Sequence, residues 1–274
     1  MVGLSAKRET AAYLREQYKF SERRTCRLIR LWRSAKRYSK KDDDSRELRQ
    51  RMRFLSERWR RFGYRRIHVM IKREGIQVNH KKVYRIYREE KLSLRAKKRK
   101  KYISVTRTPL PTPSAANERW SMDFVSDQLG PNGRRFRCLN IVDDFTRECL
   151  AIVVDTSLPG ERVAETLDRL AFSGRRPKAI VIDNGPELTG RALDEWAFKN
   201  QVKLEFIRPG KPTENAFIES FNGKFRDECL NENWFTGLQH AQEIIEEWRQ
   251  NYNSKRPHSS LGGLTPEEFA KKTA

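Results

Sequence analysis

Positive charge is distributed very unevenly along this chain. Residues 1–114 contain 36 Lys and Arg against 11 Asp and Glu, an excess of 25 positive charges. Residues 115–274 contain 22 Lys and Arg against 25 Asp and Glu. A segment that repels itself this strongly needs a polyanionic partner, and nucleic acid is the usual one. The sequence therefore predicts two parts with different tasks, and the first of them binds phosphate.

Composition limits the other classes of protein. Hydrophobic residues make up 37% of the chain, enough for a buried core. No run of about 18 apolar residues and no signal-peptide pattern is present, so we expect no membrane partner and a cytoplasmic protein. The four cysteines form no CxxC pair, and the histidines lack zinc-finger spacing. We expect buried, reduced thiols, with a zinc site from scattered members as the minor alternative.

The basic part has a helical pattern. Residues 9–38 predict two short, arginine-rich helices, either a helix-turn-helix or a basic hairpin packed on the core. Three further helices are predicted at 45–62, 64–74 and 80–92, with Asn79 as the cap of the last. A proline-rich linker then follows. The expected domains are 1–44 (helix-turn-helix-like), 45–104 (helical, DNA-binding), 105–116 (linker) and 117–274 (catalytic core with C-terminal helices).

The remaining part alternates between strand and helix patterns. Strands are predicted at 120–127, 137–143, 149–155, 179–183 and 203–207, and helices at 161–172, 190–200, 213–230 and 239–252. Three consecutive strands predict an antiparallel meander, and the later two predict a parallel βαβ extension. The expected fold class is α/β, a mixed five-stranded sheet flanked by helices and preceded by an all-α basic region.

Three carboxylates stand in unusual surroundings. Asp123 lies within the first strand, Asp183 ends the fourth, and Glu219 lies in a largely apolar helix. The first and fourth strands are expected to be neighbours, and a following helix can place Glu219 over them. Three close carboxylates repel one another unless a cation lies between them, and hard oxygen ligands suit Mg²⁺ or Mn²⁺. Taken singly, each residue is more often an ordinary strand acid, turn former or solvated helix residue.

Several segments carry a family resemblance. WSMDF (120–124), VIDNGPEL (181–188), ENAFIESFNGKFRDECLNENWF (214–235) and YNSKRPHSSLGGLTPEEF (252–269) resemble the retroviral-integrase-type core of DDE transposases. The basic block at 60–92 is similar to the helical DNA-binding region of the OrfB product of the insertion sequence three family. Thirty-five residues separate Asp183 from Glu219, the spacing for which this superfamily is named. Small departures from the family pattern occur at Trp32, Lys36, Ile182 and Leu188.

The resemblance implies an RNase H-like core in which Asp123, Asp183 and Glu219 hold two Mg²⁺ or Mn²⁺ ions and catalyse strand cleavage and transfer. Asn184 and Glu187 are expected to support these ligands. Arg226, seven residues after Glu219, matches a basic family residue and is expected to contact phosphate; an ion pair with Asp227 or Glu228 is the alternative. The predicted DNA-binding residues are Arg226, Lys224, Arg65, Arg66, Lys81, Lys82 and Arg85.

The same resemblance implies the partners. These are double-stranded DNA (element ends and target), further copies of the chain, and an OrfA-type helix-turn-helix protein or an OrfAB fusion, because the chain begins like the second frame alone. In a bacterial cell such a protein is expected at the nucleoid. The alternatives are a catalytically silent DNA-binding regulator, a nuclease that cuts without joining, and a basic structural protein. Asp143 and Asp144 are interpreted as turn and cap residues.

Overall fold

The computed structural model describes residues 3–38, 45–94, 112–130, 133–185, 187–208 and 215–273. The chain forms two compact units, residues 1–48 and residues 49–274. The basic run 97–101, most of the predicted linker 105–116 and the first residues of the helix predicted at 213–230 lie outside the described residues.

The first unit contains three helices where the sequence predicts two. They are α1 (Leu4–Tyr18), α2 (Glu22–Leu28) and α3 (Arg33–Arg37). Ser21 caps α2, since its hydroxyl accepts a hydrogen bond from Arg24 N at 3.3 Å. The prediction missed α3 because its five residues, RSAKR, have no apolar periodicity. Trp32 is 83% exposed, so this unit leaves a large aromatic side chain on its surface.

A helical module follows. It consists of α4 (Arg46–Arg58), α5 (Tyr64–Arg73) and α6 (His80–Glu89), close to the predicted spans. The module lies in the second unit except for the first three residues of α4. Asn79 caps α6 as expected, with its side-chain oxygen 2.8 Å from Lys81 N. Apolar residues at helical spacing form a small buried core, among them Met52, Leu55, Ile67, Ile71, Val83 and Ile86.

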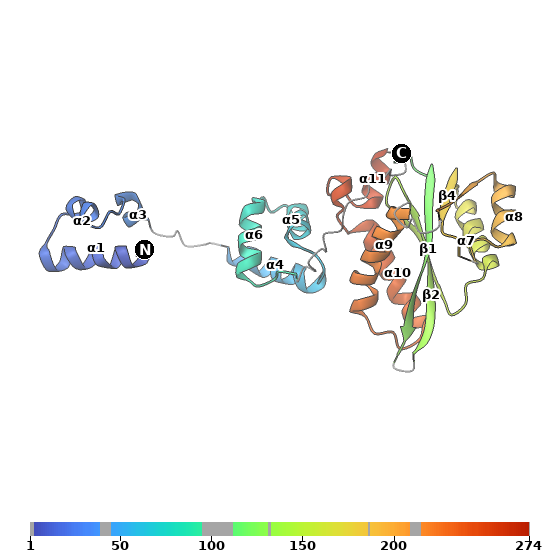
Figure 1. The fold of residues 1–274 in the computed structure, drawn as a ribbon, viewed down its shortest axis with the longest axis horizontal. Helices are drawn as coiled ribbons and strands as arrows, with labels where there is room; N and C mark the ends of the chain where they lie inside the picture. The colour runs from blue at the N-terminus through green and yellow to red at the C-terminus, as the bar shows by residue number, and fades with distance from the viewer. Residues whose placement is uncertain are drawn as a thin grey trace. The chain divides into compact units, whose positions relative to one another are not determined.

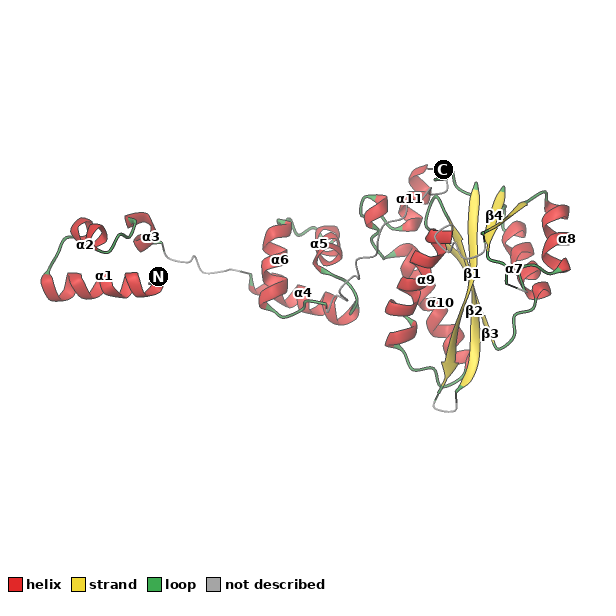
Figure 2. Cartoon of the chain, in the orientation of Figure 1, coloured by secondary structure: helices red, strands yellow, loops and turns green. Residues whose placement is uncertain are grey.

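A five-stranded sheet follows (Figures 1 and 2). Its strands are β1 (Arg119–Leu129), β2 (Arg134–Asp143), β3 (Cys149–Asp155), β4 (Ala179–Ile182) and β5 (Lys203–Phe206). The order is β3-β2-β1-β4-β5, in which β1 to β3 are antiparallel and β1, β4 and β5 are parallel. Both the meander and the expected adjacency of the first and fourth strands are confirmed.

Helices cover both faces of this sheet (Figure 1). α7 (Gly160–Phe172) and α8 (Arg191–Asn200) lie on one face, and α9 (Ala216–Glu228) and α10 (Leu238–Ser254) lie on the other. Each face has its own apolar core, one built around Trp120, Met122 and Ile141 and the other around Phe136, Phe221 and Phe225. The mixed sheet flanked by helices confirms the expected fold class.

The C-terminal segment holds three short elements that the sequence reading left out. Two are single turns, η2 (Leu230–Glu232) and η3 (Ser259–Leu261), and the third is α11 (Pro266–Thr273). Thr265 and Glu268 form a reciprocal capping box at the start of α11, with bonds of 3.2 and 2.8 Å. The motif TPEE was therefore a readable start signal that the strand and helix periodicity alone did not reveal.

Side chains of β1 alternate between the two faces. Trp120 and Met122 point into the core shared with α7 and α8, whereas Val125 points into the core shared with α9 and α10. Because the period of a strand is two residues, Asp123 lies on the α9 side together with Val125. The fold thus directs this carboxylate toward the helix that carries Glu219.

Candidate active site

Three contacts fix α9 along β1. Asn215 Nδ2 donates to Met122 O at 3.5 Å, Asn222 Nδ2 donates to Asp123 Oδ2 at 2.7 Å, and Arg226 Nη2 donates to Ser126 O at 3.4 Å. Residues 219, 222 and 226 lie on one side of a helix with 3.6 residues per turn. Glu219 therefore lies on the side of α9 that faces the strand.

Asp183 follows β4 directly, at the edge where β1 and β4 run parallel. The ladder pairs Trp120 with Ile180 and Ser121 with Val181. Continued by two residues, this register brings Asp183 opposite Asp123 on the same face of the sheet. Gly185 N donates to Asp183 Oδ1 at 3.0 Å, and a Cβ atom on Gly185 would lie 3.0 Å from the same oxygen. Glycine at this position therefore lets the turn close over the carboxylate.

The electrostatics of Asp123 show that the three carboxylates share one neighbourhood. The pKa of Asp123 is raised to about 6, chiefly by burial and also by the negative charges of Asp183 and Glu219. Hydrogen bonds from Phe124 N and from Asn222 act against this rise in pKa. Among the described residues, Asp123 therefore has two neighbouring negative charges and an amide, Asn222, as its side-chain hydrogen-bond partner.

These residues fit a divalent cation by their chemistry. All three side chains offer carboxylate oxygens, the donors that Mg²⁺ and Mn²⁺ prefer, and their mutual repulsion is relieved by a cation. Within the described residues, no three Asp, Glu, His or Cys side chains converge tightly enough to form a finished ligand cluster.

Two asparagines that the sequence reading missed support this site. Asn140, which is 0% exposed and lies opposite Asp123 in the β1–β2 ladder, donates from Nδ2 to Asn222 Oδ1 at 2.7 Å. Asn222 in turn donates to Asp123 Oδ2 at 2.7 Å. Asp123 Oδ1 accepts from Phe124 N at 2.7 Å. Both oxygens of Asp123 are therefore held in place. A buried Asn in an otherwise apolar strand, CLNIV, was the available signal.

The residues expected to support the ligands make different contacts. Asn184 Nδ2 donates to Ile207 O at 2.9 Å and so joins the ends of β4 and β5. Glu187 forms an ion pair with Arg137 of β2, and this hydrogen bond lowers the pKa of Glu187. Arg137 also lies over the ring of Phe124, 4.3 Å from its centroid. These contacts hold the Asp183 turn against the sheet, beside Asp123.

The interpretation of Asp143 and Asp144 is right for the first and wrong for the second. Asp143 Oδ1 accepts from Phe145 N and Thr146 N, as a turn residue does. Asp144 is 0% exposed and instead accepts from Arg119 Nε and from Ser121 Oγ, each at 2.7 Å. Sequence periodicity could not reveal this ion pair because its partners are about 25 residues apart along the chain.

The predicted DNA-binding residues differ in their exposure and in their protein partners. Arg65 and Lys81 are exposed on the helical module, and Arg85 forms an ion pair with Glu89 at 3.9 Å. Arg226 is exposed on α9, and its guanidinium donates to Ser126 O while Glu228 is bound by other arginines. Lys224 and Arg66 are part-buried, and Lys82 is half-buried on α6.

Comparison with known proteins identifies the family. Residues 113–212 and 200–266 both match the Integrase core domain family, and residues 42–102 match the HTH-like domain family. The chain is 53% identical over 260 residues to an uncharacterized 31.7 kDa protein of insertion element IS407 from Burkholderia multivorans, with 94% of each chain covered. The chain belongs to the DDE transposases of the insertion sequence three family.

Other comparisons agree with this assignment. A 39.2 kDa protein of insertion element IS476 from Xanthomonas euvesicatoria is 46% identical, covering 96% of this chain and 76% of the relative. The putative transposase InsK of IS150 from Escherichia coli is 27% identical and covers 78% of each chain. A simian T-cell lymphotropic virus intasome structure has a similar fold, with a TM-score of 0.51 at 14% identity, covering 80% of this chain and 74% of that one.

As a DDE transposase the chain is a polynucleotidyl transferase, and its function is DNA integration and transposition. The HTH-like helical module and the integrase core both indicate binding to DNA. None of the helices in the described ranges has the length and apolarity needed to cross a bilayer.

Proposed function

We propose that this transposase cleaves and rejoins DNA strands at the ends of an insertion sequence with Asp123, Asp183 and Glu219 as its catalytic carboxylates. The observation that supports the assignment is the closeness of the three carboxylates. The β1–β4 register brings Asp183 opposite Asp123, and the charges of Asp183 and Glu219 contribute to the raised pKa of Asp123. Such crowding of like charge is costly in a folded protein unless function requires it.

The proposed metal ligands are these same three side chains, with Mg²⁺ or Mn²⁺ as the ions and two ions as the expected number. A bound divalent cation supplies Lewis-acid activation of the attacking oxygen and neutralises charge on the phosphate. Asn222 and Phe124 N hold Asp123 so that one lone pair of each carboxylate oxygen is used and the others stay available. Asn140 fixes the amide of Asn222 in the orientation that donates toward Asp123.

DNA binding is proposed to follow from the exposed cations. Arg226 lies on the same side of α9 as Glu219, so its guanidinium is positioned for a phosphate next to the scissile bond. Arg65, Lys81, Lys82 and Arg85 lie on the helical module, where they would bind the backbone of an element end. Asn184 and Glu187 support the Asp183 turn rather than touch substrate.

The number of DNA segments in the reaction is the basis of the proposed assembly. Joining needs two element ends and a target, so more than one copy of the chain is expected in the active complex, and an OrfA-type partner or fusion is expected to add sequence recognition. The expected place of action is the bacterial nucleoid within the cytoplasm.

The test uses the full chain, a labelled duplex that contains an element end, and Mn²⁺ or Mg²⁺. Asp183→Asn is expected to abolish both nicking and joining while DNA affinity stays within about twofold, because the substitution keeps the shape of the side chain. Asp194→Asn, an exposed acid of α8, is the matched control and should leave both steps intact. Cleavage that persists in Asp183→Asn would exclude the proposed site. Cleavage without any joined product would favour a nuclease.

A further inference from the structure

A second cluster of residues lies on the opposite side of α9 from Glu219, and two of its members on this helix are charged. Phe217, Lys224 and Glu228 are spaced seven and four residues apart, so they share one face of this helix. That face is rotated by about half a turn from the face that carries residues 219, 222 and 226. The two groups therefore have different surroundings although they belong to the same helix.

Arginines from three other segments gather along this face. Arg147, in the turn between β2 and β3, has its guanidinium 3.9 Å from the ring centroid of Phe217. Arg256, after α10, binds Glu228 with two bonds of 2.7 and 2.6 Å. Arg66 of α5 reaches the same Glu228 at 3.2 Å. Lys224 lies between the two ends of this row, one turn before Glu228.

The row holds more positive charge than its carboxylate can balance. Glu228 already forms a bidentate ion pair with Arg256, which is 2% exposed. Asp144, whose charge opposes the lowering of the pKa of Arg147 by burial, is bound to Arg119. His258 adds no negative charge, and burial together with Arg256 lowers its pKa to about 2. Four cations, Arg66, Arg147, Lys224 and Arg256, thus lie along this face of α9, where Glu228 is already bound by Arg256 and Arg66.

Two of these cations have no ion-pair partner among the described residues. Arg147 Nη1 is buried and makes no hydrogen bond. Among the described residues, Lys224 has neither a hydrogen bond nor an ion pair, although it is half-buried. Burial and the neighbouring arginines lower the pKa of Lys224 to about 8. Leaving desolvated cations unpaired costs free energy in the isolated protein, so a purely structural role does not explain their gathering.

We propose that Lys224, Arg147 and Arg66 form an anion-binding site for a phosphate of the DNA backbone, on the side of α9 away from the catalytic carboxylates. The choice of DNA as the source of the phosphate rests on the proposed function. A phosphate group matches this set because it accepts several bonds at once from guanidinium and ammonium donors.

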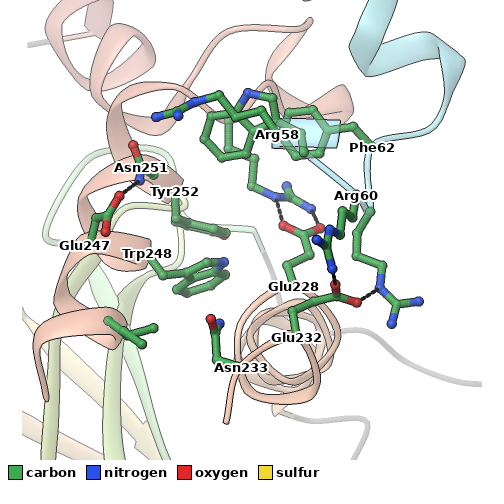
Figure 3. Close-up of a pocket in the computed structure, with 14 residues that line it drawn as sticks. Arg58, Arg60, Phe62, Glu228, Glu232, Asn233, Glu247, Trp248, Asn251 and Tyr252 are labelled. Atoms are coloured by element: carbon green, nitrogen blue, oxygen red, sulfur yellow. Dashed lines mark hydrogen bonds and ion pairs between the residues drawn. The ribbon is translucent and has the colours of Figure 1, made fainter. Parts of the chain in front are cut away.

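The surroundings give a path for a DNA strand. The side chain of Arg66 is 32% exposed, so the row opens to solvent at its α5 end. A cavity of about 270 Å³ adjoins it, lined by residues 58–62 and by Glu228, Glu232 and Tyr252 (Figure 3). Arg60 at the rim is 76% exposed, and Arg61 is 46% exposed although it binds Glu232 at 2.6 Å. A strand that crosses this rim would meet further guanidinium groups before it reaches Lys224.

The test compares Lys224→Met with Lys199→Met, a matched change of an exposed lysine on α8. Fluorescence anisotropy of the full chain with a duplex is recorded over a series of NaCl concentrations. Lys224→Met is expected to weaken binding about tenfold and to reduce the slope of log K against log [NaCl] by about 1, the change for one lost phosphate. Lys199→Met should match the parent chain in both quantities.

Thermal unfolding without DNA separates this role from a structural one. Lys224→Met is expected to raise Tm, because it removes a cation that repels its neighbours. Inorganic phosphate, compared with NaCl at equal ionic strength, should raise the Tm of the parent chain more than that of Lys224→Met.

A lower Tm for Lys224→Met with an unchanged salt slope would overturn the proposal and make Lys224 a structural residue. If inorganic phosphate raises the Tm of the parent chain but Lys224→Met leaves the salt slope of DNA binding unchanged, the site does not bind DNA. That result would identify a free anion as its ligand. Asp183→Asn should keep the full salt slope, so failure at this site and failure of the proposed catalytic triad are distinguishable.

Discussion

The two sides of α9 have opposite electrostatic character. On the β1 side, Glu219 joins Asp123 and Asp183; burial, with a smaller contribution from the two neighbouring carboxylates, raises the pKa of Asp123 to about 6. On the other side, Lys224 lies among arginines, and burial with these neighbours lowers its pKa to about 8. Each side carries an excess of one sign that the protein does not neutralise. This contrast is why we propose separate sites on the two sides of α9, one for a metal cation and one for a phosphate.

The largest expected effect tests the acidic side. Glu219→Gln removes one carboxylate from the shared field but keeps the length of the side chain. Strand cleavage in Mn²⁺ is expected to fall by about 10³-fold or more, since catalytic residues that act as a unit lose most activity together. A gel assay on an end-containing duplex measures this, with anisotropy to show that DNA binding persists. Cleavage at a tenth of the parent rate would place Glu219 outside the site.

The next effect tests the acid on the opposite side of the same helix. Glu228→Gln leaves the buried guanidinium of Arg256 without its charge partner. The free energy of unfolding is expected to fall by about 3–5 kcal/mol, the usual cost of breaking a buried pair from one side. Urea unfolding followed by circular dichroism measures it, with Glu267→Gln as control, because the Glu267 side chain is 45% exposed and its ion pair with Lys271 lies at the surface. An unchanged free energy of unfolding would show that Arg256 finds another partner.

A smaller effect is expected for the amide chain behind Asp123. Asn222→Ala removes the bond to Asp123 Oδ2 and leaves Asn140 Nδ2 without its acceptor. We expect Mn²⁺ affinity to fall by about 10- to 100-fold, as for other residues that orient metal ligands. Calorimetric titration with Mn²⁺ measures the affinity directly. Ser220→Ala, an exposed neighbour on α9, should bind Mn²⁺ like the parent chain.

The last prediction concerns how the free energy of unfolding depends on pH. The pKa of Asp123 in the folded chain, about 6, is above its ordinary value of 3.8. The ionised carboxylate therefore destabilises the metal-free fold, and this penalty appears as pH rises from about 4 to 6. Asp123→Asn should be more stable than the parent by about 3 kcal/mol above pH 6 and equal to it below pH 4. Urea unfolding with chelator at several pH values measures the difference, and a less stable variant at pH 7 would contradict it.

The general arrangement of the core could be predicted from sequence because its signals are local. CLAIVVD gives β3 at its observed bounds, and three strands before the first helix predict the meander. The neighbouring positions of β1 and β4 follow from the order of strands and helices. The position of Asp123 on the α9 side then follows from the period of a strand.

The supporting contacts could not be predicted, because they join residues that are distant along the chain. Asn140 and Asn222 are 82 residues apart, and only the folded sheet brings them together. Arg66 reaches Glu228 across 162 residues, so nothing in the local pattern separates it from the exposed Arg65. The roles proposed for Asp123, Asp183 and Glu219 remain predictions until the substitutions above are measured.

The ion pair between Arg256 and Glu228 predicts how truncation of the coding sequence would affect the insertion sequence. Arg256 lies 37 positions after Glu219 along the chain. A stop codon just after Tyr252 would leave every proposed catalytic acid encoded, yet it would delete Arg256, which holds the end of α9 through Glu228. Copies of the element truncated at this point are expected to be immobile in the genome.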